Sequence, residues 1–369
     1  MLPPANENLR VLFLMHVDVR WIKQRPHFLS EGLSDVFDVT VAYSRANRRR
    51  ALLRSADLGV ARWPIFRFPV RRNPVSWMLD RLMLAIQYAL LLLVIRPHVI
   101  VVPFPDLMSR VITLCGAKII YDCMDDAVAV FKHRGLRNRI AAAERALCRA
   151  ATSIIASSAH LACTLEARHW VQGVRVIRNA FNGHILEPAG LRTMPASDRV
   201  LRLGYFGTIS HWFDFETLES ALAATGSECY VVGPLEVEFP ASERIHYQGI
   251  VPHNELLNFS RSVDILIMPF TVTDLIFSVD PVKIYEYINF DIPIICIHYP
   301  EVDRFEKFCF FYSDTHELIT AIETARQGKK YSDRDRREFL SANSWQNRID
   351  ELAEVIRNAG RQRAGEQSG

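Results

Sequence analysis

The sequence lacks the cysteine pattern of a disulfide scaffold or a zinc site. Its seven cysteines are odd in number and scattered, and no two of them form a C-x-x-C pair. Neither a disulfide framework nor a zinc knuckle is expected from this spacing, which fits a reducing cytosol. An excess of one charge is also missing, because 44 basic and 41 acidic residues leave a net charge of only +3. This balance gives no overall reason to expect a nucleic acid partner.

Long hydrophobic runs are absent as well. The chain opens on a polar segment, 1–8, and its first apolar run, 11–15, has the length of a strand, so no secretory signal is expected. The most apolar stretch without a charged residue is 82–95. As a helix it would rise about 21 Å, less than the hydrocarbon core of about 30 Å, so it is not expected to span a membrane.

The remaining composition is that of an ordinary globular protein. Of the 369 residues, 49% are hydrophobic and 23% are charged, which excludes a disordered or collagen-like chain. A chain of this length is expected to form two domains. Short apolar runs alternate with helical patterns in both halves, which predicts an α/β fold of two doubly wound, Rossmann-like domains. The predicted strands are 9–15, 39–43, 98–102, 118–121, 153–157 and 174–177, then 201–206, 228–232, 245–248, 265–269 and 292–297.

Turn-forming residues separate the two halves. Asn179, Asn182, Gly183 and Pro188 lie close together, and the segment that follows has no apolar period, so a linker is expected there. A final helix lies outside the alternation and precedes a polar tail that is expected to be disordered. The predicted units are an N-terminal domain at 1–184, a linker at 185–199, a C-terminal domain at 200–344, the final helix at 345–360 and the tail at 361–369.

Two segments of the second domain carry residue types that suit a phosphate site. Ligands of doubly wound sheets bind at the carboxyl ends of strands, and the strand 201–206 is followed by Gly207 and Thr208, whose backbone can approach a phosphate closely. A tight turn without a ligand is the alternative. Further on, Lys283 is expected near the N-terminus of a helix, where anions are favoured. Glu286 follows on the same helical face and can accept ribose hydroxyls, although a plain surface salt bridge has the same spacing.

At this point the chain resembles a known family, the nucleotide-sugar glycosyltransferases with the two-domain GT-B architecture. The resemblance covers almost the whole chain and is strongest to bacterial cell-surface polysaccharide enzymes, such as glucuronosyltransferases of the xanthan type and enzymes of the teichuronic-acid type. It implies two domains that face each other across a cleft and a final helix that crosses back to the first domain. The segments that carry it are 21–26, 121–126, 203–208, 248–252 and 280–293.

In such enzymes the second domain binds the donor nucleotide. The resemblance therefore implies a nucleoside diphosphate sugar as donor, with UDP as the expected nucleotide, and no metal or other cofactor. Lys283 would contact the diphosphate and Glu286 the ribose, while the loop 248–252 would flank the base. The implied donor-site residues are Gly207, Thr208, Val251, Lys283, Tyr285 and Glu286.

Two departures from the family pattern favour an inverting reaction. Many retaining members have a second glutamate eight positions before the one that matches Glu286, and this chain has Ser278 there. Those members also have an arginine or lysine soon after the glycine that matches Gly207, whereas 208–215 contains neither. The cationic pair of the retaining group is therefore missing, which leaves Lys283 as the main phosphate cation.

The acceptor side is expected in the first domain. Inversion needs a general base, because a sugar hydroxyl is a poor nucleophile until it loses its proton. Asp125 is the expected base, since it follows the strand 118–121 in a segment that resembles the catalytic loop of the xanthan-type enzymes. Neighbouring aspartates would raise its pKa, although capping of the next helix is the alternative role. The loop after the first strand adds three candidates for acceptor contacts, His16, Asp18 and Arg25.

Arginine is concentrated in one segment of the first domain. Ten arginines and two aspartates lie between positions 45 and 81, a local net charge of +8 against +3 for the whole chain. Because aromatic residues are interleaved and an apolar helix follows, the segment from Arg45 to Ile95 is expected to rest on an anionic membrane surface. A solvated loop followed by a buried core helix is the alternative, and no nucleic-acid motif accompanies the arginines.

Together these features predict an inverting glycosyltransferase that moves a sugar from a nucleoside diphosphate to a lipid-linked or polysaccharide acceptor. Its expected place is the cytoplasm, peripheral on the inner face of the plasma membrane. A nucleotide-sugar 2-epimerase of the same architecture and a non-catalytic membrane-bound scaffold are the alternatives. A nicotinamide-dependent oxidoreductase is disfavoured, because the first strand ends in His16, Val17 and Asp18 without a G-x-G-x-x-G turn.

Overall fold

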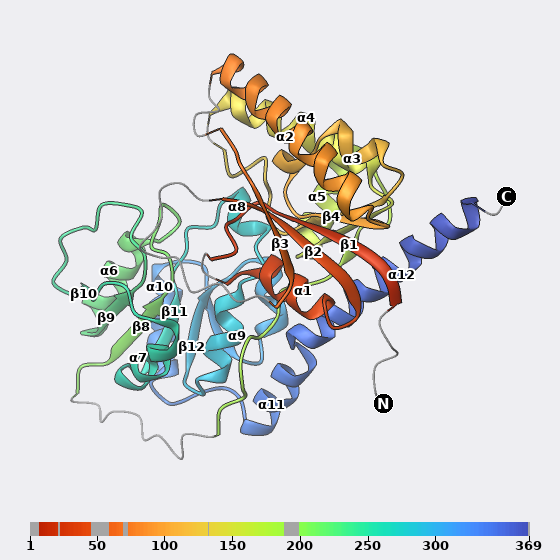
Figure 1. The fold of residues 1–369 in the computed structure, drawn as a ribbon. Coiled ribbons are helices and arrows are strands. Elements are labelled where there is room, and N and C mark those ends of the chain that lie inside the picture. Colours follow the sequence, from red (N-terminus) through yellow and green to blue (C-terminus); the bar gives the residue numbers. More distant parts are fainter. Residues whose placement is uncertain are drawn as a thin grey trace. The chain divides into compact units, whose positions relative to one another are not determined.

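The computed structural model describes residues 7–20, 23–45, 59–68, 73–131, 133–187 and 199–367. The chain forms two compact units, which we call unit 1 (Met1–Asn179 with Trp345–Gly369) and unit 2 (Ala180–Ser344). Each unit has a parallel sheet flanked by helices (Figure 1). The predicted fold class, two doubly wound α/β domains, is confirmed.

The sheet of unit 1 has seven strands in the order β3-β2-β1-β4-β5-β6-β7, and all neighbouring pairs are parallel. All four residues of β4 are buried, as expected for a strand with helices on both faces. The edge strand β3 is not predicted from the sequence, because Arg62 and Pro64 interrupt its apolar pattern. Proline is tolerated there because the strand lies at an edge. The strands are β1 (Glu7–Met15), β2 (Phe37–Ser44), β3 (Ala61–Ile65), β4 (Val99–Val102), β5 (Lys118–Cys123), β6 (Ser153–Ala156) and β7 (Arg175–Val176).

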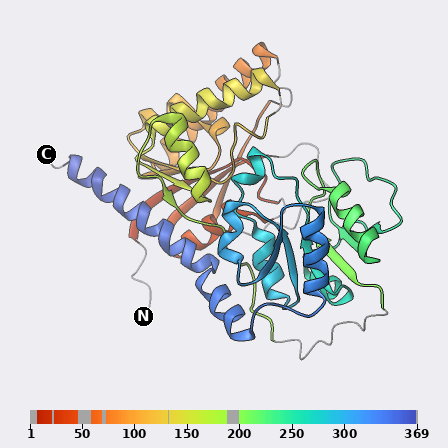
Figure 2. The same cartoon turned by 180° about the vertical axis from the view of Figure 1, so that it is seen from behind.

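Two groups of helices cover this sheet. Helices α2 (Pro74–Ile95), α3 (Arg110–Leu114), α4 (Arg134–Ala150) and α5 (Ala159–His169) lie on one face and share an apolar core with it (Figure 1, Figure 2). A short 3-10 turn, η2 (Pro105–Leu107), precedes α3. On the other face, α1 (Arg25–Leu33) packs against α12 (Trp345–Gln367), where Phe28 stacks on Trp345 with ring centroids 4.7 Å apart. Pro26 in the first turn of α1 fits the predicted helix start.

Helix α2 is longer than the predicted 82–95. It begins at Pro74, has 22 residues and is therefore about 33 Å long. Asp80 and Arg81 interrupt the apolar run in the sequence. In the structure Asp80 is completely buried and pairs with Arg67 at 2.7 Å. By length and composition α2 could cross a membrane, so the prediction that this segment is too short to do so is wrong for the whole helix.

Unit 2 has a six-stranded parallel sheet in the order β10-β9-β8-β11-β12-β13. One continuous apolar core joins the sheet to its helices. The strands are β8 (Arg202–Phe206), β9 (Glu228–Val232), β10 (Ile245–Tyr247), β11 (Ile265–Met268), β12 (Ile294–Ile297) and β13 (Cys309–Tyr312). The helices are α6 (Phe215–Thr225), η3 (His253–Glu255), α7 (Leu256–Ser262), α8 (Asp274–Phe277), α9 (Val282–Asn289), η4 (Pro300–Phe305), α10 (Thr315–Ala325) and α11 (Asp333–Ala342).

The unit boundaries differ in detail from the predicted domains. Unit 2 begins at Ala180, before the predicted linker 185–199, and the backbone N–H of Phe181 donates to the carbonyl of Asn343 within it at 2.8 Å. Residues 188–198 of that linker lie outside the described residues. Helix α12 belongs to unit 1 and runs to Gln367 instead of ending at 360. The predicted tail continues this helix as far as Gln367, because five of the residues 361–367 are arginine, glutamine or glutamate and none is proline.

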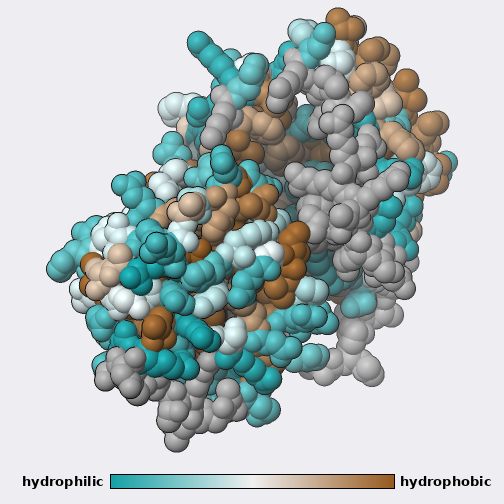
Figure 3. Space-filling model, turned by 90° about the vertical axis from the view of Figure 1, so that its left-hand side faces the viewer, coloured by the Kyte–Doolittle hydropathy of each residue, from teal (hydrophilic) through white to brown (hydrophobic). Residues whose placement is uncertain are grey.

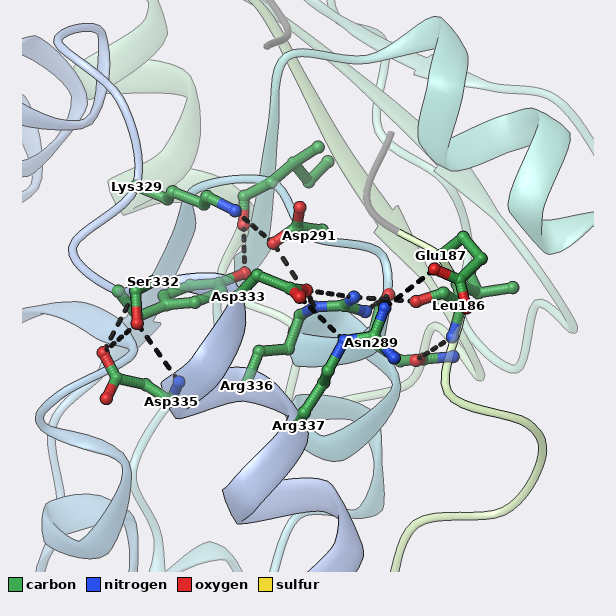
Figure 4. Close-up of polar contacts among 12 residues, drawn as sticks. Leu186, Glu187, Asn289, Asp291, Lys329, Ser332, Asp333, Asp335, Arg336 and Arg337 are labelled. Atoms are coloured by element: carbon green, nitrogen blue, oxygen red, sulfur yellow. Dashed lines mark hydrogen bonds and ion pairs between the residues drawn. The ribbon is translucent and has the colours of Figure 1, made fainter. Parts of the chain in front are cut away.

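A buried arginine anchors α11 to α9 in unit 2 (Figure 4). Arg336 has no exposed surface, and its guanidinium donates to the carbonyl oxygens of Asn289 at 3.0 Å and Leu186 at 2.7 Å. The same group pairs with Asp333 at 2.5 Å. A buried cation is tolerated here because carbonyl and carboxylate oxygens accept its hydrogen bonds.

Replacing Arg336 by alanine is expected to lower the free energy of unfolding by about 2–4 kcal/mol, because two carbonyl acceptors lose their donor. The matched control is Arg337→Ala on the same helix. The Arg337 side chain is 37% exposed and pairs with Asp333 and Glu187, so its loss is expected to change stability little. Urea unfolding of both variants measures the difference, and equal losses would contradict the anchoring role of Arg336.

Candidate functional site

Two glycines end neighbouring strands of unit 2 and bring their turns into contact. Gly207 follows β8 and Gly233 follows β9, and their φ angles are +135° and +134°, where glycine is favoured. A Cβ atom at Gly233 would lie 2.1 Å from the carbonyl oxygen of Gly207. Since no side chain fits between the two turns, both positions require glycine.

The Lys283 side chain lies across Gly207. A Cβ atom at Gly207 would be 2.0 Å from Cε of Lys283, so the glycine makes room for the lysine stem. The ammonium group lies beside a pair of packed aromatic rings, 5.6 Å from the centroids of both Tyr205 and Phe270. Desolvation lowers the pKa of Lys283 to about 8, and nearby Glu286 opposes the shift. The result is a desolvated cation at the carboxyl end of β8.

Helix α9 has Lys283 and Glu286 on one face and Tyr285 on the face that packs against the core. Its N-cap residue, Pro281, makes no side-chain capping bond. Tyr285 is completely buried on the core side, where its hydroxyl donates to Asp280 at 3.2 Å and contacts Arg304. Tyr285 was predicted in the donor site, but the structure assigns it a packing role, because residues two positions apart on a helix point in different directions.

The two backbone amides of the turn after β8 differ in their hydrogen bonding. The Gly207 N–H donates to the carbonyl of Val232 at 2.9 Å, so this amide is part of the sheet and the prediction that it faces a phosphate needs correction. For the N–H of Thr208 no acceptor is found among the described residues, and its carbonyl accepts from the Tyr205 hydroxyl at 2.9 Å. Thr208 therefore supplies the free backbone donor of this turn.

The loop 248–252 is tied to the same strand ends. The Gly249 carbonyl accepts from the Gly233 N–H at 2.8 Å, and the half-buried Val251 packs against the unit core. Just beyond the loop, Nε2 of His253 lies 2.8 Å from Oε1 of Glu286, whose side chain is only 16% exposed. The hydrogen bond to Glu286 raises the pKa of His253. The loop, Lys283 and Glu286 thus border one end of the sheet.

In unit 1, two of the three neighbouring aspartates have fixed partners. Asp122, at the end of β5, is fully buried and pairs with the buried Arg25 at 2.8 Å. Asp126 accepts from the backbone N–H groups of Val128 and Ala129, both at 3.0 Å, and pairs with Arg168 at 2.6 Å. Burial acts to raise the pKa of Asp126, but the hydrogen bond and charge of Arg168 together with the two amides outweigh it and lower the pKa. These two amides belong to the turn 127–130, and the next helix, α4, has His133 as its N-cap, so the alternative helix-capping role of Asp125 is not seen.

Asp125 lies between these two anchored residues and has a different environment. The residue is exposed, and in the described part of the chain no hydrogen-bond partner is found for its carboxylate. Protein atoms around it nevertheless desolvate the charge and raise the pKa to about 6; Arg25 opposes this rise and Asp126 adds to it. An accessible carboxylate with a pKa close to neutrality has the properties of a general base.

Further contacts fix the loop that carries Asp125. The hydroxyl of Ser157, after β6, donates to the carbonyl of Met124 at 2.8 Å. Arg168 also pairs with the buried Glu144 at 3.1 Å, and Glu144 in turn accepts from the hydroxyl of Tyr121 at 3.1 Å. Asp125 therefore sits on a loop held from both sides, which limits the orientations that its carboxylate can adopt.

The three predicted acceptor residues differ in their surroundings. Asp18 is buried and accepts from Arg20 at 2.9 Å, and Arg25 is held by Asp122, so both are already occupied. His16 stacks on Phe104 with ring centroids 5.1 Å apart. Desolvation lowers the pKa of His16 to about 4, so the ring is neutral at physiological pH. Phe104 packs against the segment just after Asp125, which places this stacked pair beside the candidate base.

Several residues of these sites are not predicted from the sequence. Gly233, His253, Phe270 and Arg168 are far along the chain from the residues they contact, and their contacts form only in the folded sheet. Gly233 alone had a signal, because it follows a predicted strand just as Gly207 does. No group of three or more His, Cys, Asp or Glu side chains that could hold a metal ion is found in the described part of the chain.

Comparison with known proteins connects this geometry to a fold. No family model and no curated protein matches the sequence. Among solved structures, sucrose-phosphate synthase from Thermosynechococcus elongatus has a TM-score of 0.72 at 12% identity, covering 95% of this chain and 98% of that one. HepE from Anabaena, in complex with UDP and glucose, has a TM-score of 0.59 at 14% identity, covering 98% and 100%. UDP-N-acetylglucosamine 2-epimerase from Rickettsia bellii has a TM-score of 0.55 at 9% identity, covering 96% and 98%.

At these identities the likeness shows the fold. It extends over nearly the full length of this chain and of each solved structure, so both units take part in it. The predicted resemblance to GT-B nucleotide-sugar glycosyltransferases is thereby confirmed at the level of the fold, whereas the xanthan and teichuronic-acid types stay predictions. The chain has the two-domain GT-B fold.

Proposed function

We propose that this protein is a glycosyltransferase that takes a sugar from a nucleoside diphosphate donor, with UDP as the nucleotide. The observation that carries the proposal is the desolvated Lys283 laid across Gly207, with Glu286 one turn later on the same helix face. A cation at a strand end suits a diphosphate, and a carboxylate one turn away suits the two ribose hydroxyls. Structures of the same fold with bound UDP, such as HepE with UDP and glucose, support this assignment.

In the proposed donor site, charge neutralisation is the main contribution to catalysis. The departing diphosphate gains negative charge as the glycosidic bond breaks, and Lys283 with the N–H of Thr208 would stabilise it. Because the lysine is desolvated and confined by Tyr205 and Phe270, its charge is strong and well positioned. No metal ion or other cofactor is part of the proposal.

On the acceptor side we assign the general base to Asp125 and propose an inverting reaction. The carboxylate of Asp125 would take the proton of the acceptor hydroxyl as that oxygen attacks the sugar carbon. The His16 and Phe104 pair offers an aromatic surface for a sugar ring, and the neutral imidazole can hydrogen-bond a hydroxyl without carrying charge. We propose a lipid-linked or polysaccharide acceptor of the cell envelope, met on the inner face of the plasma membrane.

The donor site should respond to the charge of His253. Below its raised pKa the imidazolium pairs most strongly with Glu286 and competes with ribose hydroxyls for the carboxylate. UDP affinity is therefore expected to fall between neutral and mildly acidic pH, and this fall should be smaller in His253→Ala. Calorimetric titration of both proteins across that range separates the effect from titration of UDP itself. An identical pH profile for the two proteins would contradict competition at Glu286.

The direct test of the proposed function is calorimetric titration with UDP, GDP and ADP. Selective binding of UDP that is lost in Glu286→Ala would support the donor site. Incubation with UDP-sugars and membrane lipid extracts then tests transfer, while incubation without any acceptor tests a 2-epimerase, because epimerisation needs none. Binding of no nucleotide would overturn the transferase and favour a scaffold that only retains the fold.

A further inference from the structure

The outer face of α2 is an exposed apolar stripe. Its residues recur every three or four positions along one side of the helix, so they form a row about 29 Å long. In Figure 3 hydrophobic residues form a band along the upper right of the molecule, where α2 lies. The exposed fractions are Val75 60%, Met78 60%, Leu79 42%, Leu82 58%, Ile86 55%, Leu90 55%, Leu93 71% and Val94 66%. A row of this size on a protein surface marks an interaction site.

The inner face of α2 is fixed to unit 1. Leu84, Tyr88 and Leu91 are buried in the core that the helix shares with the sheet. The Tyr88 hydroxyl donates to the carbonyl of Leu107 at 3.1 Å, and the buried Asp80 pairs with Arg67 at 2.7 Å. Leaving the sheet would break this ion pair and expose the core, which is strongly unfavourable. Helix α2 therefore lies flat on unit 1 with its stripe outward.

On the described helices α2, α3 and α4, the exposed charged residues are all positive. The only acidic residues of α2, α3 and α4 are Asp80 and Glu144, and both are buried and paired with arginine. Arg139 of α4 lies 5.2 Å from the ring centroid of Trp77 in α2, which shows that the two helices are neighbours. The exposed arginines of α3 and α4 are Arg110, Arg134, Arg137, Arg145 and Arg149. Of the expected basic segment between 45 and 81, Arg48, Arg49, Arg50, Arg54, Arg71 and Arg72 lie outside the described residues.

We propose that the α2 stripe and the arginines of α3 and α4 form one docking surface for a bilayer of anionic phospholipid. The stripe would enter the boundary between headgroups and acyl chains with α2 parallel to the membrane, while the arginines pair with phosphate groups. A second copy of the chain fits less well, because a two-fold interface would bring two rows of arginine together without acidic partners.

This inference deepens the proposed function and rests on it: a membrane-docking surface serves a glycosyltransferase whose lipid-linked acceptor lies in a bilayer. The surface itself is argued from exposure and charge alone. Nucleotide binding and vesicle binding are measured separately, so either proposal can fail while the other holds.

Co-sedimentation with vesicles tests the surface. The full chain is expected to pellet with vesicles of phosphatidylcholine mixed with phosphatidylglycerol, and much less with phosphatidylcholine alone or at high salt. Leu93→Glu should weaken the binding at least about tenfold, because it puts a charge into the apolar row. Glutamate is a good helix former, so the exposed position should tolerate it in the fold. Replacing Arg137 and Arg145 together by alanine should weaken binding to the anionic vesicles only.

Matched controls lie in unit 2. Val200→Glu changes a residue that is 45% exposed, and Arg334→Ala removes an exposed arginine; both are expected to leave vesicle binding unchanged. Each variant should also bind UDP like the native protein. Vesicle binding that is absent in the native protein, or unaffected by Leu93→Glu, would overturn the proposal. So would a native dimer that Leu93→Glu dissociates without any binding to vesicles, because the occupant would then be a second copy.

Discussion

Replacing Asp125 by asparagine is expected to lower the rate of sugar transfer by about 10²–10⁴-fold while UDP binding stays unchanged. The size follows from the loss of a general base, since the amide has the shape of the carboxylate and cannot take a proton. Asp125 is suited to this role because its neighbours are occupied: Arg25 holds Asp122, and Arg168 with two backbone amides holds Asp126. Single-turnover transfer and calorimetry with UDP measure the two quantities separately.

The pH profile gives a second readout of the same residue. The base must be ionised, so the transfer rate at saturating donor, which the charge of His253 does not affect through binding, is expected to rise with pH through about 6, where desolvation places the pKa of Asp125. An ordinary aspartate, with a pKa of 3.8, would leave this range flat. The residual activity of Asp125→Asn should lack the rise.

The control for Asp125 is Asp35→Asn, an exposed aspartate after α1. It should change neither the rate nor the pH profile. Because desolvation disfavours the charged form of Asp125, Asp125→Asn is also expected to keep or slightly raise Tm near neutral pH, so lost activity would not reflect unfolding. Full transfer by Asp125→Asn, or an unchanged profile, would remove the residue from the role of base.

The fold was predictable where local pattern and burial agree. Strands such as β4 and β11 are short apolar runs buried by helices on both faces, and the sequence shows them directly. Helix α11 escaped prediction because it begins with six charged residues, and its largest buried side chain is Arg336, not an apolar one. A pattern based on hydrophobic spacing cannot detect a helix that is anchored by a buried cation.

The candidate sites were predictable only where their residues lie on one helix at a known spacing. Lys283 and Glu286 share a face because they are three residues apart, and the same rule excludes Tyr285 from that face. The partner of Glu286, His253, comes from another part of the sheet edge, and no spacing in the sequence connects the two. Gly207 was chosen for its amide, whereas the structure uses its missing side chain to make room for Lys283. Contacts between distant segments depend on the sheet order, which one sequence does not display.

Replacing Lys283 by alanine is expected to weaken UDP binding about 10–100-fold, because hydrogen bonds to charged groups contribute about 1.5–3 kcal/mol. Uridine, which has no phosphate, should bind the variant and the native protein equally. Glu286→Ala should instead weaken both ligands, since the ribose is common to them. Lys307→Ala, on a lysine whose side chain is 61% exposed, is the matched control and should leave both affinities unchanged.

Proton uptake on UDP binding gives a second measurement of the role of Lys283. The pKa of free Lys283 is lowered to about 8, and a bound diphosphate would favour the ammonium form. UDP affinity is therefore expected to fall as pH rises through about 8, and binding near that pH should take up protons. Calorimetry in buffers of different ionisation enthalpy measures the uptake, which should vanish in Lys283→Ala and for uridine. If Lys283→Ala weakens UDP and uridine equally and the proton uptake persists, the lysine supports the fold of the turn and another cation meets the diphosphate.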